Sequence, residues 1–125
     1  MYSTGKLSEI SGVSSRTLRY YDEIGLLKPS FINESGYRYY DDKEVALLQQ
    51  ILFYKERGFD LQTIKEIIYS KDFDISSALE EHLLSLEEEK KKIDIMINSV
   101  KLSIKSLKGE YNMSDKEKFE VFKKK

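Results

Sequence analysis

The chain has 125 residues, among which there is no cysteine and only one histidine, His82. These absences exclude a disulfide framework, a thiolate metal site, an iron–sulfur cluster and thiol-based redox sensing by this chain. No apolar run is long enough to span a bilayer, and the first twenty residues are polar and periodic, unlike a signal peptide. We therefore expect a cytoplasmic protein with no metal, no cofactor and no membrane partner.

Catalytic patterns are missing as well. The six glycines are scattered as turn and cap residues instead of forming a phosphate-cradling loop, and no nucleophile is paired with a base. The sequence therefore does not predict an enzyme. An apolar content of 40% with 12% aromatic residues is that of a folded chain. Its length suits one compact domain plus one extended element.

The stretch from Ser14 to Leu27 has the period of a helix. Ser14 suits the N-cap position, and apolar side chains at 18, 21 and 24 recur at spacings of three on one face. Gly25 suits a left-handed position at the helix end. The opposite face carries two guanidinium groups and a phenol, in the residues Arg16, Thr17, Arg19 and Tyr20.

A shorter helix precedes this one, with Thr4 as the expected N-cap, Leu7 and Ile10 facing inward, and Gly12 as the break. Two helices joined by a short glycine-containing turn are the pattern of a helix-turn-helix, whose second helix enters the DNA major groove. The alternative is a pair of packed helices with a solvated basic face.

Residues 28–40 predict a short two-stranded hairpin. The turn-forming residues 33–36 separate Phe31 and Ile32 from the aromatic segment 37–40. Such a hairpin is marginal alone, so we expect it to lean on the helices as a wing. Arg38 is its main candidate for a phosphate or minor-groove contact, flanked by Tyr37 and Tyr39, although one or two of these aromatics could simply fill the core.

A second helix pair follows the wing. Asp41 and Glu44 have the spacing of a capping box, Gly58 suits a helix end, and Asp60 suits the next N-cap. The inner faces of the two helices are apolar, through Val45, Leu48, Ile51, Leu52, Leu61, Ile64, Ile67 and Ile68. Lys55 and Arg57 lie at the corner and could reach a further phosphate. Residues 69–74 form a linker.

The clearest periodicity comes next. Spacings of four and three alternate along a predicted helix of four heptads, with Lys90 as the only polar member and His82 as a surface or flank residue. The helix is too long to bury this stripe on the small N-terminal module, so we expect it to pair with a second copy. Its acidic first half and basic second half favour an antiparallel pair. The dimerisation residues are Leu79, Leu83, Leu86, Ile93, Ile97, Val100, Ile104 and Leu107.

The predicted fold is mainly α. A winged helix-turn-helix domain of four helices and a small β-hairpin occupies residues 1–74, and the dimerisation helix occupies 75–108. Residues 109–125 are a tail, expected to be mobile or to form a helix with nothing to pack against, and they end in three lysines. Because the net charge is only −1, DNA affinity must come from the placement of charge and from two copies of the site.

The run from Arg16 to Leu27, followed by Gly36-Tyr37-Arg38-Tyr39-Tyr40, resembles the MerR family of bacterial transcription regulators. The helix pair and the long helix also stand where that family has them. Residues 48–59 and the tail around 113–122 look like the Mta/TipA-type branch, which senses multidrug compounds and antibiotics.

The resemblance implies a homodimer, formed through antiparallel long helices, that places two winged modules on successive major grooves of double-stranded promoter DNA. MerR-like proteins bind a pseudo-palindrome in an overlong promoter spacer and distort it so that RNA polymerase engages both elements. The matching DNA-contact residues are Ser15, Arg16, Thr17, Arg19, Tyr20, Tyr21, Tyr37, Arg38, Tyr39 and Lys55.

The resemblance also has limits. Metal- and redox-sensing members use cysteines, which are absent here. Ligand-sensing members carry an effector domain after the long helix, so this chain resembles the DNA-binding and dimerisation portion of a longer regulator, and no effector ligand is expected to bind it. Two alternatives remain: an architectural winged-helix protein that bends DNA, and a coiled-coil interaction protein whose helix-turn-helix is only a structural cap.

Overall fold

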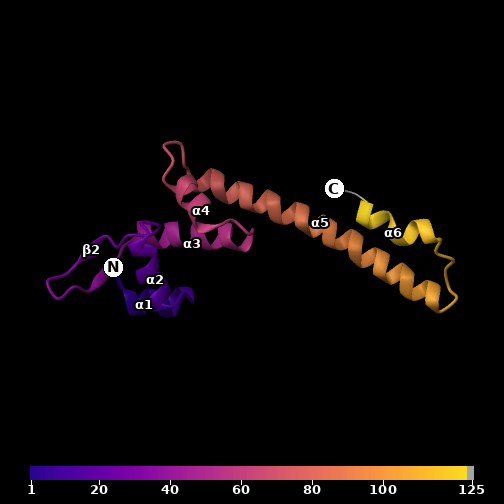
Figure 1. Cartoon of the computed structure of the whole chain (residues 1–125), viewed down its shortest axis with the longest axis horizontal. Coiled ribbons are helices and arrows are strands. Elements are labelled where there is room, and N and C mark those ends of the chain that lie inside the picture. The colour runs from indigo at the N-terminus through magenta and orange to yellow at the C-terminus, as the bar shows by residue number, and fades with distance from the viewer. Residues whose placement is uncertain (124–125) are drawn as a thin grey trace. The chain divides into compact units, whose positions relative to one another are not determined.

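The computed structural model describes residues 1–123 and is mainly helical (Figure 1). Lys124 and Lys125, two of the three terminal lysines, lie outside the described residues. The elements follow the order β1 (Tyr2–Ser3), α1 (Thr4–Ser11), α2 (Ser15–Glu23), β2 (Phe31–Ile32), β3 (Arg38–Tyr40), α3 (Asp42–Glu56), α4 (Leu61–Ile68), α5 (Ile75–Leu107) and α6 (Asp115–Lys123). They divide into two compact units, the first ending at His82 and the second beginning at Leu83.

The predicted helix boundaries are largely confirmed, because they depend on local caps. The Ser14 hydroxyl accepts a hydrogen bond from the Thr17 backbone N–H at 3.0 Å, and the Asp60 carboxylate accepts one from the Thr63 N–H at 2.7 Å. Gly25 has φ +74°, the left-handed conformation that lets the chain turn after α2. The predicted N-cap of α1 is wrong by one residue, since Ser3, not Thr4, accepts the hydrogen bond from the Lys6 N–H.

The wing is part of a three-stranded antiparallel sheet in the order β1-β3-β2, whereas the sequence predicts only a hairpin. Tyr2 pairs with Tyr40, and Phe31 pairs with Tyr39. The extra strand hydrogen-bonds the second edge of β3 and so stabilises a hairpin that would be marginal alone. It escapes prediction because two residues carry no alternation signal.

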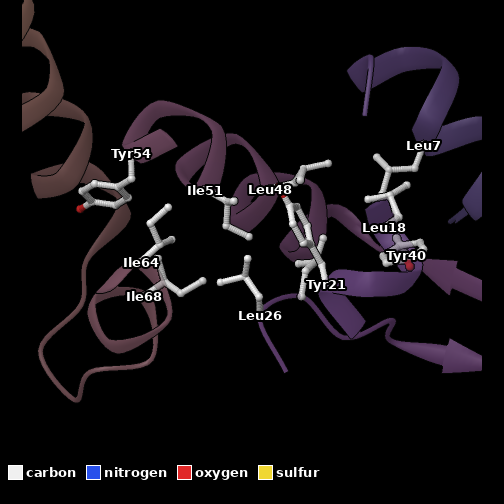
Figure 2. Close-up of a cluster of buried hydrophobic side chains, with 11 residues drawn as sticks. Leu7, Leu18, Tyr21, Leu26, Tyr40, Leu48, Ile51, Tyr54, Ile64 and Ile68 are labelled. Atoms are coloured by element: carbon white, nitrogen blue, oxygen red, sulfur yellow. The ribbon is translucent and has the colours of Figure 1, made fainter. Parts of the chain in front are cut away.

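The core of the first unit is a continuous row of apolar side chains running from Leu7 past Tyr21 to Tyr54 (Figure 2). Helices α1 to α4 and strand β3 all contribute to it. The predicted inward orientation of Ile10 is wrong, since half of its surface is exposed. α1 is only eight residues long, and Leu7 alone covers the core beside Leu18 and Tyr40. The buried members are Leu7, Leu18, Tyr21, Leu26, Leu27, Tyr40, Leu48, Ile51, Tyr54, Ile64 and Ile68.

The first turns of α5 belong to the first unit. His82, at the end of this part of the helix, has only 3% of its surface exposed. Of the two places expected for His82, the surface is therefore wrong, and the residue lies on the flank of the leucine stripe. The heptad pattern identified the face of the helix that carries the leucines, but it carried no information about a partner on the adjacent face near the helix start.

The second unit is a helical hairpin in which α6 lies along α5. Met113 is buried to 6% exposure, and the Ser103 hydroxyl donates to its sulfur at 3.4 Å. Val121 lines an apolar groove together with Ile95, Met96 and Leu102 of α5. The expectation that the tail has nothing to pack against is therefore wrong. No helix in the described part of the chain has the length and hydropathy to cross a membrane.

Candidate nucleic-acid interface

The exposed face of α2 gathers the predicted basic and aromatic side chains. Arg16, Arg19 and Tyr20 are exposed, and they line an open surface hollow together with Thr17 and Glu23. Leu18 and Tyr21 on the opposite face are buried, which fixes the helix by its apolar side. The amphipathic period therefore presents two guanidinium groups outward on a rigid support, as contacts to phosphates or base edges require.

The wing is tied to α2 by an ion pair. Arg38 of β3 donates from Nε to Asp22 Oδ2 of α2 at 2.7 Å, and both side chains are largely shielded from solvent. Lys28 approaches the other oxygen of the same carboxylate at 3.4 Å. The hydrogen bond from Arg38 to Asp22 raises the pKa of the guanidinium, which keeps it charged. This ion pair uses one of the five N–H donors of the Arg38 guanidinium, so the other donors are available to a ligand.

Several wing side chains are open to solvent. Phe31, Ile32 and Tyr37 are each more than half exposed, while Tyr39 is partly buried beside Phe31, with ring centroids 6.0 Å apart. The Asn33 side chain closes the turn by accepting backbone N–H bonds from Ser35 and Tyr37. The prediction that part of the aromatic segment fills the core is confirmed by Tyr40, which is fully buried.

Tyr21 differs from the other predicted contact residues because only 1% of its surface is exposed. Its hydroxyl accepts a hydrogen bond from Lys55 Nζ at 3.2 Å, and the ammonium also lies 5.9 Å from the ring centroid. The structure thus brings Lys55 of α3 to α2, and Tyr21 acts here as a core residue that holds it. Ser15 is half-buried next to Ser14, the N-cap of α2.

Three side chains that the sequence analysis did not single out hold this surface in place. Asp22 anchors the wing, as described above. Lys65 of α4 donates to the Ile24 carbonyl at 2.9 Å, and the Tyr69 hydroxyl donates to the Leu26 carbonyl at 2.9 Å. Both bonds satisfy carbonyls at the C-terminal end of α2 and in the turn after it. Their separation of more than forty residues leaves no sequence signal.

The predicted dimerisation stripe is exposed at every position, with fractions from 38% for Leu79 to 90% for Leu107. On α5 it lies opposite the residues Ile95 and Leu102 that pack toward α6. An apolar stripe of this length on one helix is a surface that soluble monomers rarely leave open. The described residues contain no group of three or more histidines or carboxylates placed to hold a metal ion.

Comparison with known proteins gives a family match. The model of the MerR HTH family regulatory proteins matches residues 2–71. The HTH-type transcriptional activator Mta of Bacillus subtilis is 42% identical over 118 residues, which are 94% of this chain and 46% of the relative. The activator TipA of Streptomyces coelicolor is 36% identical over 121 residues, 97% of this chain and 48% of the relative. The chain therefore spans about half the length of these relatives.

Solved structures agree with these matches. The crystal structure of the regulator SkgA from Caulobacter crescentus has a TM-score of 0.89 and 36% identity, covering 97% of this chain and 87% of that one. HiNmlR, a MerR family regulator lacking the sensor domain and solved bound to promoter DNA, has a TM-score of 0.51 and 32% identity, covering 86% of this chain and 84% of that one.

Proposed function

Because this chain belongs to the MerR family of HTH regulatory proteins, we propose that it binds, as a homodimer, a pseudo-palindrome in a promoter spacer. We further propose that it distorts this DNA so that RNA polymerase engages both promoter elements. The comparisons themselves establish a MerR-type DNA-binding transcription regulator related to the Mta and TipA activators. We also propose a role in a multidrug or antibiotic response, because of the likeness to those two activators. That this chain has the activity of a whole regulator is likewise a proposal.

One observation carries the DNA-binding part of the proposal: three guanidinium groups on two elements that an ion pair holds together. Arg16 and Arg19 face outward from α2, and Arg38 on the wing is bonded to Asp22 of the same helix. Phosphate contacts from such groups set register and orientation, and helix residues near them read base edges in the major groove. Thr17 and Tyr20 line the same hollow as Arg16 and Arg19. Ser15 precedes Arg16 in the sequence, Tyr37 and Tyr39 flank Arg38, and Lys55 adds a charge from α3.

The dimer is supported by the exposed stripe on α5. An antiparallel pair would set the acidic residues 87–89 of one copy near Lys101 of the other, whereas a parallel pair would align like charges. Two copies would also double the phosphate contacts of a protein whose net charge is only −1.

Selection of bound fragments from genomic DNA, followed by footprinting, tests the proposal. The expected result is a protected pseudo-palindrome between promoter elements, with enhanced cleavage at its centre where the DNA is distorted. Binding without sequence preference would instead support the architectural alternative, and no binding at all would leave the coiled-coil alternative. Run-off transcription from the selected promoter then tests activation.

A variant pair makes this test specific. Arg19→Ala removes an exposed charge from the α2 face, while Lys71→Ala removes one from the linker between α4 and α5. The proposal requires that only the first variant loses operator binding and that both remain dimers in sedimentation velocity.

A further inference from the structure

His82 is the only histidine of the chain, and the proposed function does not use it. It stands on the second turn of α5 and is 3% exposed. Its Nδ1 lies 3.0 Å from Arg57 Nη1, and its Nε2 lies 3.1 Å from Gln50 Oε1. The ring packs against Phe53 and Tyr54, with centroids 5.0 Å and 4.5 Å away. A single side chain of α5 is thus held by four residues of α3 and its C-cap.

The chemistry of these partners fixes the state of the imidazole. A guanidinium only donates hydrogen bonds, so Nδ1 must accept, and the ring proton must sit on Nε2, where it is donated to Gln50. His82 is therefore neutral and in one tautomer. Burial, and next the charge of Arg57, lower the pKa of His82 from its ordinary value, while Glu81 opposes this shift.

Arg57 contacts α5 at a second residue as well. Its Nη1 also donates to Glu81 Oε1 of α5 at 2.9 Å, and its guanidinium lies 4.9 Å from the Phe59 ring centroid and 5.7 Å from that of Tyr54. The charged groups that face the imidazole are therefore Arg57 from the end of α3 and Glu81 from α5, with the Tyr54 phenol beside them. Gln50 is fully buried, so its carbonyl has no alternative partner in solvent.

The contacts of His82 connect two elements of the proposed function, the long helix α5 and, through α3, the helix α2. α5 continues as one helix from Ile75 to Leu107, and its first turns up to His82 belong to the N-terminal unit. α3, which holds His82, also sends Lys55 to the Tyr21 hydroxyl of α2. An apolar contact tolerates sliding, but a buried pair of directional hydrogen bonds has one arrangement and loses both bonds when the helix turns.

We propose that His82, held by Arg57 and Gln50, is the positioning residue that couples α5 to α3, so that its loss impairs promoter activation more than operator binding. The inference rests on the proposed function for its transcriptional consequence. The coupling itself concerns only contacts within the N-terminal unit.

The test compares wild type with two substitutions of His82, and with one control substitution, in the 125-residue chain. His82→Phe keeps an aromatic ring for Phe53 and Tyr54 but removes both hydrogen bonds. His82→Asn retains a carbonyl oxygen close to the position of Nδ1 and so keeps an acceptor for Arg57. Glu80→Gln, at an exposed position of α5 close to His82, is the control.

Two measurements decide the outcome. In the free protein, backbone hydrogen exchange in residues 75–82 is expected to be about tenfold faster in His82→Phe, with a smaller increase in His82→Asn and none in Glu80→Gln. With the selected promoter, His82→Phe is expected to lower run-off transcription at least about fivefold more than it lowers operator affinity, and His82→Asn to recover part of the activation.

Unchanged exchange in His82→Phe would overturn the coupling, and so would a loss of transcription that only follows the loss of affinity. If His82→Phe does not fold, the same two criteria apply to His82→Asn. Failure of the wild-type chain to bind any promoter would overturn the proposed function instead, and the exchange measurement would still decide whether His82 holds α5 on α3.

Discussion

Asp22 and Arg38 are sixteen residues apart in the chain, yet Arg38 Nε lies 2.7 Å from Asp22 Oδ2. The bond joins the last full turn of α2 to the middle strand of the sheet, so that helix and wing present their basic groups as one surface. In the proposed function the carboxylate supports DNA binding by orienting Arg38, although its own negative charge repels the phosphates. Loss of this orientation would weaken DNA binding, whereas loss of the negative charge would strengthen it, so a substitution of Asp22 distinguishes the two effects.

Asp22→Asn is expected to weaken operator binding about fivefold, equivalent to about 1 kcal/mol, even though it removes a negative charge from the DNA-facing unit. The reason is that Arg38 and the wing lose their orientation. Glu23→Gln removes a charge from the next residue, which is exposed, and should leave binding unchanged or strengthen it. Equilibrium titration with a fluorescent operator measures both variants. Equal strengthening in both would show that Asp22 acts only through its charge.

Arg19→Ala is expected to reduce operator affinity by about 1–3 kcal/mol. If Arg19 contacts a phosphate, the slope of log K against log salt concentration should also fall by about one. Lys71→Ala is the control for the general loss of one positive charge. Binding isotherms at several salt concentrations give both quantities, and an unchanged affinity in Arg19→Ala would exclude the exposed face of α2 as the contact surface.

Ile97→Glu is expected to convert the proposed dimer to a monomer, because a carboxylate in the centre of an apolar helix pair is desolvated without a partner. Ile95→Glu introduces the same charge on the face of α5 that lines the groove beside α6 and should leave the dimer intact. Sedimentation equilibrium distinguishes the two. A dimer that survives Ile97→Glu but not Ile95→Glu would place the interface on the α6 side.

Acidification is expected to destabilise the N-terminal unit through His82. Its pKa is lowered in the folded state, so the unfolded chain binds the proton more readily. The contribution of His82 to stability is therefore complete above the ordinary histidine pKa of about 6.5 and is lost progressively as the pH falls below that value.

Urea unfolding between pH 8 and pH 5.5 checks this expectation. The wild-type chain should lose more stability over this range than His82→Phe, which has no group titrating at that site. Parallel pH dependences in the two proteins would show that the folded state does not hold His82 neutral.

Sequence patterns predicted much of this molecule because they report interactions over a few residues. Ser14 and Asp60 mark helix starts by capping N–H groups three residues on, and Gly25 marks an end by its left-handed backbone. The heptad of α5 follows from the same helical geometry. These local rules placed the helices, the wing strands and the exposed side chains of α2.

The family motif is more informative than these local rules, because it links the α2 run to the wing, which no local period does. It also carried Tyr21 into the set of contact residues, whereas the structure places that side chain in the core with Lys55 on its hydroxyl. The amphipathic period had already put Tyr21 on the inner face. A motif records which residues recur, and core residues recur as well as contact residues.

The sequence by itself determined helices α1 to α5, most of their apolar faces and the basic face of α2, since each depends on residues within one or two helical turns. Only the tertiary structure decided that β1 extends the wing, that Asp22 bonds Arg38, that α6 packs on α5, and that His82 is buried against Gln50. Those contacts join residues separated by 10 to 38 positions in the chain. They form because folding of the whole chain brings distant residues together, and a pattern that spans a few residues contains no information about such contacts.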